Sequence, residues 1–433
     1  MAQLVNTDYP LKAVAVCILF SFIYIFYDIC TSVGINYEGD ITISNQKSKR
    51  SSHERNPKYI LEWAKRRGKI VYPTIKCSDN CIFTRDKGRF DGDYTKFDAI
   101  IFNEDILSTN ERPIKRDPSQ IYIFSTLESS YTVPACEIHD DDYFNWTFTY
   151  RLDSDIVWSY FQVRSLKGQI VAPRVSVTWK QNNHPVKKKI RYILKRKNKA
   201  AAWLVSHCRA DSLRDDYLTR LQEHLFHYSL KIDVYGDCSK RKCPNNACGY
   251  MIRKDYYFYM AFENSFADDY VTEKILHGYE NYAVPIVYGG ANYSRFLPPG
   301  SYINAREIHP YNLAFKMYQA IKNREIYLKY FKWTNLYTIT SEVKPHPLCE
   351  VCKRLHNMEG VYPARKYFRL WWNRLNGMKW CLSNEFWNET SNVNIDVRTL
   401  CKLWLRKNTA TIRKVVLHGQ PMRALHTPQY CLQ

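Results

Sequence analysis

The sequence predicts an α/β protein built on parallel sheets, and three features support this prediction. Short apolar segments typical of buried strands recur along the chain, helical stretches separate them, and polar residues follow the ends of several strands. The length of 433 residues is enough for two or three domains. The content of 45% hydrophobic and 15% aromatic residues excludes a disordered chain.

The first element along the chain is an apolar segment over residues 11–30. About 20 apolar residues are sufficient for a helix that spans a bilayer. We therefore expect a transmembrane signal anchor at 11–30, preceded by a cytosolic tail at 1–10 and followed by a polar stem at 31–57. A cleavable signal peptide is the alternative interpretation, although no small-residue cleavage site follows the segment.

An N-terminal domain is expected over residues 58–185. Ala99–Phe102 and Ile121–Phe124 predict two strands, and the second strand places Glu128 just beyond its carboxyl end. Residues 180–199 then hold nine lysines and arginines and no acidic residue. Because this run separates two patterned regions, we place the domain boundary there.

A C-terminal domain is expected over residues 186–355, where two strand–helix–strand units follow one another. The first unit comprises a strand at Ala202–Ser206, a helix capped by Ser212 that runs to about Tyr228, and a strand at Ile232–Tyr235.

The second unit begins with an aromatic strand at Tyr256–Phe262. A helix capped by Asp268 or Asp269 runs to about Tyr282, and the next strand is Val284–Tyr288. Strands that alternate with helices favour a parallel sheet, which binds ligands beyond the carboxyl ends of its strands.

Charged residues at these ligand-facing ends form a candidate anion site. Arg214 lies in the first turn of the first helix, and Glu273 and Lys274 lie in the first turn of the second. Free backbone N–H groups, the helix dipole and two cations together suit a diphosphate. Glu263 and Asn264 follow the preceding strand and offer polar groups to a nucleotide. The alternative for both is an ordinary loop-capping role. Nucleotide sites of the common types are missing, because the sequence has neither a P-loop nor a GxGxxG motif.

Acidic clusters at 140–142 and 153–155 raise the alternative of a metal site that holds the donor phosphates. Such clusters are usually solvated turns, and Arg214 and Lys274 already provide cationic partners for a diphosphate. We therefore expect no metal ligands in this protein.

Cysteines and glycosylation sequons indicate an oxidising, lumenal environment for the body of the chain. Of the 14 cysteines, 12 follow the apolar segment, and the sequons are at Asn145, Asn292 and Asn388. The closely spaced cysteines, for which we expect disulfides, are Cys77, Cys81, Cys238, Cys243, Cys248, Cys349 and Cys352. A four-thiolate zinc site from the first and last pairs is the alternative.

The segment Tyr256–Asn304, YYFYMAFENSFADDYVTEKILHGYENYAVPIVYGGANYSRFLPPGSYIN, resembles the signature of the α1,3-fucosyltransferases, the GDP-fucose-dependent glycosyltransferase family 10. Three more segments resemble family motifs: FNWTFTYRLDSDI at 144–156, AAWLVSHC at 201–208 and VYGDCSKRKCP at 234–244. The resemblance covers about 70–355. It leaves a basic extension with tryptophans and cysteines, residues 356–433, without a matching motif.

The resemblance implies a GT-B fold, in which two Rossmann-like domains face a cleft and the C-terminal one binds GDP-fucose. It implies inverting transfer of L-fucose from GDP-β-L-fucose to O3 of an N-acetylglucosamine in a glycoprotein glycan. We expect an N-glycan core acceptor, with an outer N-acetyllactosamine unit of the Lewis type as the alternative. No cofactor is expected to be obligatory, and a divalent cation would at most stimulate.

The resemblance also assigns roles to residues. Glu128 becomes the catalytic base, although Ser130 stands where the family usually has proline, and a capping carboxylate is the alternative role for Glu128. Arg214 and Lys274 would hold the diphosphate. The remaining donor contacts would be Tyr259, Glu263, Asn264, Tyr270 and Glu273.

By the same resemblance, Cys77 and Cys81 would be bridged to Cys349 and Cys352, so that Cys349→Ser would abolish secretion or activity. The resemblance further implies a single-pass type II protein of the Golgi membrane with a lumenal catalytic body.

The net charge of +21 offers a competing interpretation, a nucleic-acid binder. The charge is local, however. Residues 151–200 hold 13 lysines and arginines against two aspartates, and residues 351–433 hold 14 against four acidic residues. The anchor and the sequons argue against nucleic acid as a partner. A membrane-anchored glycan-binding protein that has lost catalysis is the second alternative.

Overall fold

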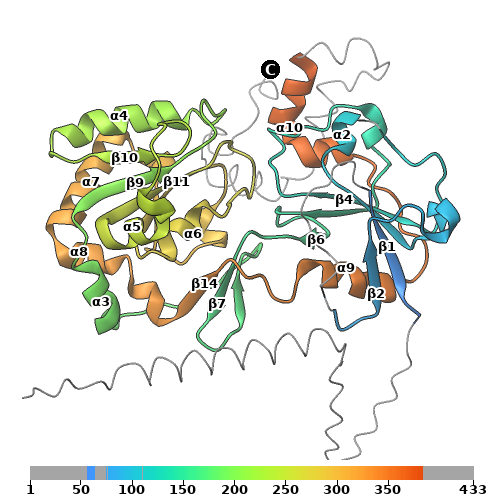
Figure 1. Cartoon of the computed structure of the whole chain (residues 1–433), viewed down its shortest axis with the longest axis horizontal. Helices are drawn as coiled ribbons and strands as arrows, with labels where there is room; N and C mark the ends of the chain where they lie inside the picture. Colours follow the sequence, from blue (N-terminus) through green and yellow to red (C-terminus); the bar gives the residue numbers. More distant parts are fainter. Residues whose placement is uncertain (1–55, 64–74, 76, 110, 384–433) are drawn as a thin grey trace, which may run out of the picture. The chain divides into compact units, whose positions relative to one another are not determined.

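The computed structural model of the chain describes residues 56–63, 75, 77–109 and 111–383 (Figure 1). These residues form two parallel sheets, each with helices packed on it, and one small antiparallel sheet. The prediction of an α/β fold with parallel sheets is therefore confirmed.

The predicted cytosolic tail, the anchor at 11–30 and nearly all of the stem lie outside the described residues. Within the described part of the chain, no helix has the length and apolar character needed to cross a membrane.

The N-terminal sheet has six parallel strands in the order β2-β1-β3-β4-β5-β6. They are β1 Lys58–Trp63, β2 Cys81–Thr84, β3 Ala99–Phe102, β4 Ile121–Thr126, β5 Trp146–Thr149 and β6 Ile156–Val157. β3 and β4 are buried along their whole length, which explains their continuous apolar sequences. β4 leads directly to Glu128.

The C-terminal sheet has five parallel strands in the order β10-β9-β11-β12-β13. They are β9 Lys199–Leu204, β10 Ile232–Tyr235, β11 Tyr256–Phe262, β12 Val284–Tyr288 and β13 Ile303–Asn304. Successive β11 side chains enter two different apolar clusters, Tyr259 on one face and Phe258 and Met260 on the other. A third, antiparallel sheet pairs β7 Gln162–Ser165 with both β8 Ile170–Ala172 and β14 Tyr337–Thr340.

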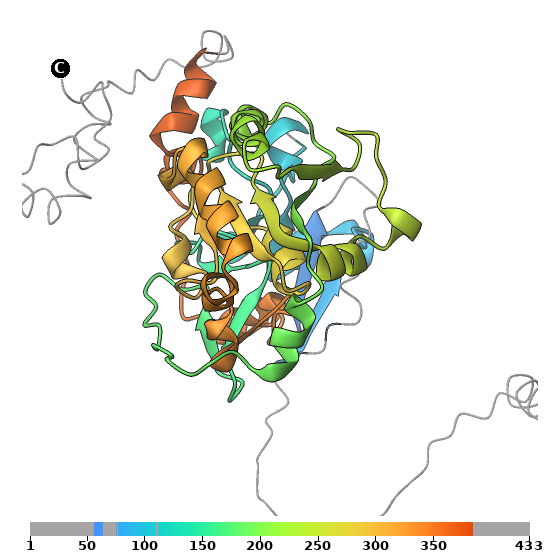
Figure 2. The ribbon, with the colours of Figure 1, turned by 90° about the vertical axis from the view of Figure 1, so that its left-hand side faces the viewer.

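Helices cover both sheets (Figure 1). They are α2 Ile106–Thr109, α3 Lys188–Leu194, α4 Arg214–Phe226, α5 Cys248–Asp255, α6 Lys274–Tyr279, α7 Pro310–Lys322, α8 Arg324–Lys329, α9 Pro347–His356 and α10 Phe368–Ser383. α4 and α7 pack against each other on one face of the C-terminal sheet (Figure 2), and α5 and α6 cover the other.

The two C-terminal helices pack on the N-terminal sheet. Leu348 and Val351 of α9 join one of its clusters, and Trp371 and Trp372 of α10 join the other. The sequence had suggested that residues up to 355 belong to the C-terminal domain, but α9 buries its apolar side against β1, β3 and β4.

Four strands, β3, β10, β11 and β12, have the predicted bounds. The predicted cap of α4 was wrong. α4 begins at Arg214, and the hydroxyl of the buried Ser212 donates to the carbonyl of Glu263 at 2.8 Å. Leu213 stands at the cap position with φ of 52°.

The predicted cap of α6 was also wrong, because α6 begins only at Lys274. The side chain of Asp269 instead accepts hydrogen bonds from the backbone N–H of Leu152 (3.2 Å) and from Arg295 (2.9 Å). Residues 264–273, which we call the donor-side loop, therefore connect β11 to α6 without a helix.

The basic run at 180–199 forms α3 and its flanks, with most of its lysines exposed. Lys197 is the exception. Its buried ammonium donates to the carbonyl oxygens of Tyr256 (2.7 Å) and of Ile252 (3.2 Å), at the end of α5. Lys197 of the basic run thus has a structural role in the C-terminal domain.

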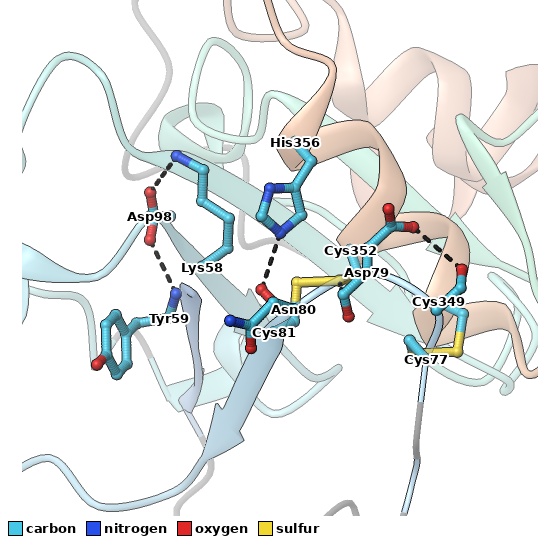
Figure 3. The surroundings of a disulfide bond; sticks show 11 residues. Lys58, Tyr59, Cys77, Asp79, Asn80, Cys81, Asp98, Cys349, Cys352 and His356 are labelled. Carbon is cyan, nitrogen blue, oxygen red and sulfur yellow. Dashed lines mark hydrogen bonds and ion pairs between the residues drawn. A yellow bond between two sulfur atoms is a disulfide. The ribbon is translucent and has the colours of Figure 1, made fainter. Parts of the chain in front are cut away.

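Two disulfides join the start of the N-terminal sheet to α9 (Figure 3). Cys77 is bonded to Cys349 and Cys81 to Cys352, which are the segments that the resemblance implied. His356 lies beside the second bridge, but both sulfurs there are bonded to each other and are not thiolates that could hold zinc.

Three further bridges complete the described cysteines. They are Cys136–Cys381, Cys208–Cys238 and Cys243–Cys248. Cys238 therefore pairs outside its own sequence cluster. The sequence did not identify Cys136, Cys208 or Cys381 as bridging residues, because their partners lie 30 or more positions away.

The double bridge changes what is expected of Cys349→Ser. Cys81–Cys352 alone closes a loop with a sequence separation of 271, so the first bridge adds only a small further ring. We expect the single variant to lose about 2 kcal/mol of unfolding free energy, and Cys349→Ser/Cys352→Ser to lose about 5 kcal/mol or more. Denaturant unfolding of both variants checks this order. Equal losses in the two variants would contradict it.

Candidate active site

Glu128 lies in the loop that follows β4, residues 127–136, which we call the base loop. Its Oε1 accepts hydrogen bonds from the hydroxyl of Tyr270 and from the backbone N–H of Ser129, both at 2.9 Å. The carboxylate is half-buried. It thus lies at the carboxyl end of a parallel strand, where such sheets bind ligands.

The base loop and the donor-side loop contact each other directly. Besides the Tyr270–Glu128 bond, the hydroxyl of Ser265 donates to that of Ser129 at 2.8 Å in a buried position. Burial and the nearby Glu128 raise the pKa of Tyr270 well above its usual range. Tyr270 therefore remains a hydrogen-bond donor and orients the carboxylate.

Lys274 and Glu263, which flank the donor-side loop, form an ion pair with each other. The ammonium lies 3.1 Å from a carboxylate oxygen of Glu263, whose side chain is 1% exposed. Thr272 donates its backbone N–H (2.9 Å) and its hydroxyl (3.0 Å) to the same carboxylate. Burial raises the pKa of Glu263, although Lys274 opposes this. Burial lowers the pKa of Lys274, but Glu263 and Glu273 outweigh it and the net shift is upward.

Arg214 is buried beneath the strand ends. Its guanidinium donates to the carbonyl oxygens of Phe262 (2.8 Å) and His207 (2.6 Å). Burial lowers the pKa of Arg214, but an arginine stays charged in proteins. A fixed positive charge therefore lies where β9 and β11 end.

Three buried polar atoms at the start of α4 and just after β11 have no hydrogen-bond partner within the described residues: Nε of Arg214, Oδ2 of Asp215 and Oδ1 of Asn264. Buried polar atoms are nearly always paired in native proteins. Unpaired polar atoms at a helix start and at a strand end are typical of a site that a polar ligand completes.

The other predicted donor contacts fall into two groups. Glu273 is exposed, and its carboxylate lies 3.7 Å from the ammonium of Lys274. Tyr259 is 1% exposed and packs in the core beside His277, so it supports the site from below.

Gly290 fits closely against the donor-side loop, because a Cβ there would lie 2.1 Å from the carbonyl oxygen of Phe266.

The acidic clusters are paired with arginines. Arg112 binds the buried Asp140, and Arg369 binds Asp141 at 2.8 Å.

The second cluster is paired in the same way. Arg365 binds Asp155 at 2.9 Å, and both Arg151 (2.9 Å) and Arg374 (2.7 Å) bind Asp153. Burial opposes ionisation of Asp153, but these two arginines lower its pKa to about 2. Asp140, Asp141, Asp153 and Asp155 are thus all paired with arginines.

The sequons differ in their surroundings. The amide Nδ2 of Asn145 donates to the carbonyl of Tyr362 (2.7 Å), and its Oδ1 accepts from the backbone of Tyr122 (2.7 Å). Asn292 is exposed. Asn388 lies outside the described residues.

Two family descriptions match the chain. The family description "Fucosyltransferase, N-terminal" matches residues 55–161, and "Glycosyltransferase family 10 (fucosyltransferase) C-term" matches residues 194–371.

Curated relatives carry matching names. The chain is 35% identical over 285 residues to alpha-(1,3)-fucosyltransferase C of Drosophila melanogaster, covering 64% of this chain and 65% of that enzyme. It is 31% identical to glycoprotein 3-alpha-L-fucosyltransferase A of the same organism, covering 72% and 58%. It is 33% identical to a 4-galactosyl-N-acetylglucosaminide 3-alpha-L-fucosyltransferase of Homo sapiens, covering 64% and 70%. The chain thus spans less than two thirds of the two Drosophila enzymes.

Proposed function

Because the chain belongs to glycosyltransferase family 10, the fucosyltransferases, we propose that it transfers L-fucose from GDP-β-L-fucose to O3 of an N-acetylglucosamine in a glycoprotein glycan. The observation that carries the proposal is the contact between the base loop and the donor-side loop. It brings a half-buried carboxylate beside the loop that ends at the Glu263–Lys274 pair.

Inversion at the fucose carbon needs one displacement, in which the acceptor hydroxyl attacks from the face opposite GDP. Glu128 would take the hydroxyl proton. Its Oε1 already accepts hydrogen bonds from Tyr270 and Ser129, so Oε2 would be the oxygen that takes the proton. Arg214 and Lys274 would stabilise the negative charge on the departing diphosphate.

No metal enters this scheme. The diphosphate charge would be met by Arg214 and Lys274, and arginines bind four aspartates of the acidic clusters, Asp140, Asp141, Asp153 and Asp155. A divalent cation would at most stimulate transfer through its free complex with GDP.

For the acceptor we propose the N-acetylglucosamine of the N-glycan core. The relatives' names include both a glycoprotein fucosyltransferase and an enzyme that acts on galactosyl-N-acetylglucosaminides. We also propose that residues 11–30 anchor the protein in the Golgi membrane with its body in the lumen, because ten cysteines of the described part are paired in disulfides.

A glycan array with labelled GDP-fucose, read with and without a chelator, tests these proposals together. We expect label on N-glycans with an accessible core, and label should persist when the chelator is present. Label only on outer N-acetyllactosamine units would show that these units, and not the N-glycan core, are the acceptor. Loss of label with the chelator would refute metal independence, and binding without any transfer would favour an inactive glycan-binding protein.

A further inference from the structure

The segment that begins α10 holds the base loop through several side chains. The side chain of Asn373, 1% exposed, accepts from the backbone N–H of Ala135 (2.9 Å) and donates to the carbonyl of the same residue (2.6 Å). Trp372 donates its indole N–H to the carbonyl of Val133 at 2.8 Å. The bridge from Cys136 to Cys381 fixes the end of the loop.

The next residue, Arg374, reaches the donor-side loop. Its Nε donates to Asp268 of that loop at 3.1 Å, and its Nη2 donates to Asp153 at 2.7 Å. Asp153 is also held by Arg151, whose Nε and Nη2 lie 3.0 and 2.9 Å from its two oxygens. Arg374 therefore connects the donor-side loop to a rigid point beside the N-terminal sheet.

The backbone at Arg374 is unusual. α10 is interrupted there, and Arg374 has φ of 58° and ψ of −179°. A long side chain rarely adopts a positive φ, and such residues persist only where the surroundings hold them. Here the kink separates the Asn373 contact on one loop from the Arg374 contact on the other.

We propose that Asn373 and Arg374 are positioning residues for fucose transfer, which together fix the base loop relative to the donor-side loop. The inference rests on the proposed function. Neither residue is assigned a contact with donor or acceptor. Both act through Glu128, because the two loops that they hold meet at the Tyr270–Glu128 hydrogen bond.

Arg374→Ala is the test variant, since the Arg374 side chain is 32% exposed and its ion pairs should contribute little to folding. Small misplacements of catalytic groups cost up to about 100-fold in rate. We expect kcat for transfer to fall ~10–100-fold, while the Kd for GDP changes less than about twofold and Tm by less than about 2 °C. The share of GDP-fucose lost to water should rise, because transfer slows and spontaneous hydrolysis does not.

Two further variants of the full chain complete the experiment. Arg374→Lys should recover part of kcat, because an ammonium can pair with one of the aspartates. Arg365→Ala is the matched control, since Arg365 lies shortly before α10 and pairs with Asp155 at 2.9 Å, and neither residue lies on the two loops. Its kcat should stay within about twofold of that of the unaltered enzyme.

The possible results separate the two proposals. Normal kcat in Arg374→Ala would overturn the positioning role, and so would parallel losses of kcat and Tm in Arg374→Ala and Arg365→Ala. Absence of transfer by the unaltered enzyme would refute the proposed function and this inference with it.

Discussion

Replacement of Glu128 by glutamine is expected to slow fucose transfer by about 10²–10⁴-fold, the usual contribution of a general base. Glutamine keeps an oxygen that can accept from Tyr270 and Ser129, so the base loop should stay in place. It cannot take the acceptor proton. The affinity for GDP should be unchanged, because Glu128 contacts neither Arg214 nor Lys274. Steady-state kinetics and calorimetric GDP titration check both parts.

Tyr270→Phe is the companion variant for this experiment. It removes the 2.9 Å hydrogen bond to Glu128 but leaves the carboxylate able to accept a proton. We expect a smaller loss of kcat in Tyr270→Phe than in Glu128→Gln. Full activity of Glu128→Gln would show that the carboxylate is only a capping group, and a loss of GDP binding in that variant would point to a collapsed site.

Local sequence patterns predicted the parts of the fold that depend on neighbouring residues. β11 and β12 were placed correctly, because continuous apolar and aromatic residues suit strands that are buried on both faces. The caps of α4 and α6 were placed wrongly. Ser212 and Asp269 have the side chains of good caps, but both are used for longer-range bonds, to Glu263 and to Leu152.

Contacts between distant segments could not be read from the sequence. The Ser129–Ser265 bond joins residues 136 positions apart, and Asn373 meets Ala135 across 238 positions. Nothing in the local pattern of either segment indicates its partner. The resemblance identified Glu128 and Lys274, but the segment 369–374 lies beyond its motifs.

The pairing of charged residues from distant segments could not be predicted from the sequence either. Three arginines of the basic C-terminal extension, Arg365, Arg369 and Arg374, pair with aspartates of the two acidic clusters. Acidic clusters and a basic tail suggested metal or nucleic acid when they were considered separately. In the described part of the chain, these three arginines pair with the aspartates.

Replacement of Lys274 by methionine should weaken GDP binding and destabilise the protein at the same time. Losing a charged hydrogen bond to the diphosphate should raise the Kd for GDP about 10–100-fold. Glu263 is 1% exposed and would lose its cationic partner, which should cost about 3 kcal/mol of unfolding free energy.

The loss of stability in Lys274→Met should depend on pH in a defined direction. Burial already raises the pKa of Glu263, and removal of Lys274 would raise it further. A carboxyl group whose pKa is higher in the folded than in the unfolded protein binds protons preferentially in the folded state. The stability of Lys274→Met, relative to the unaltered protein, should therefore fall as pH rises from about 5 to about 8. Chemical unfolding at several pH values checks this.

Glu263→Gln/Lys274→Met separates the two roles of the lysine. Glutamine carries no charge but keeps an oxygen that can accept from Thr272, so the double variant should regain most of the lost stability and lose the added pH dependence. Its affinity for GDP should stay low, because the cation that meets the diphosphate is still missing. If the double variant bound GDP as the unaltered protein does, Lys274 would serve only to neutralise Glu263, and Arg214 would remain as the cation for the donor.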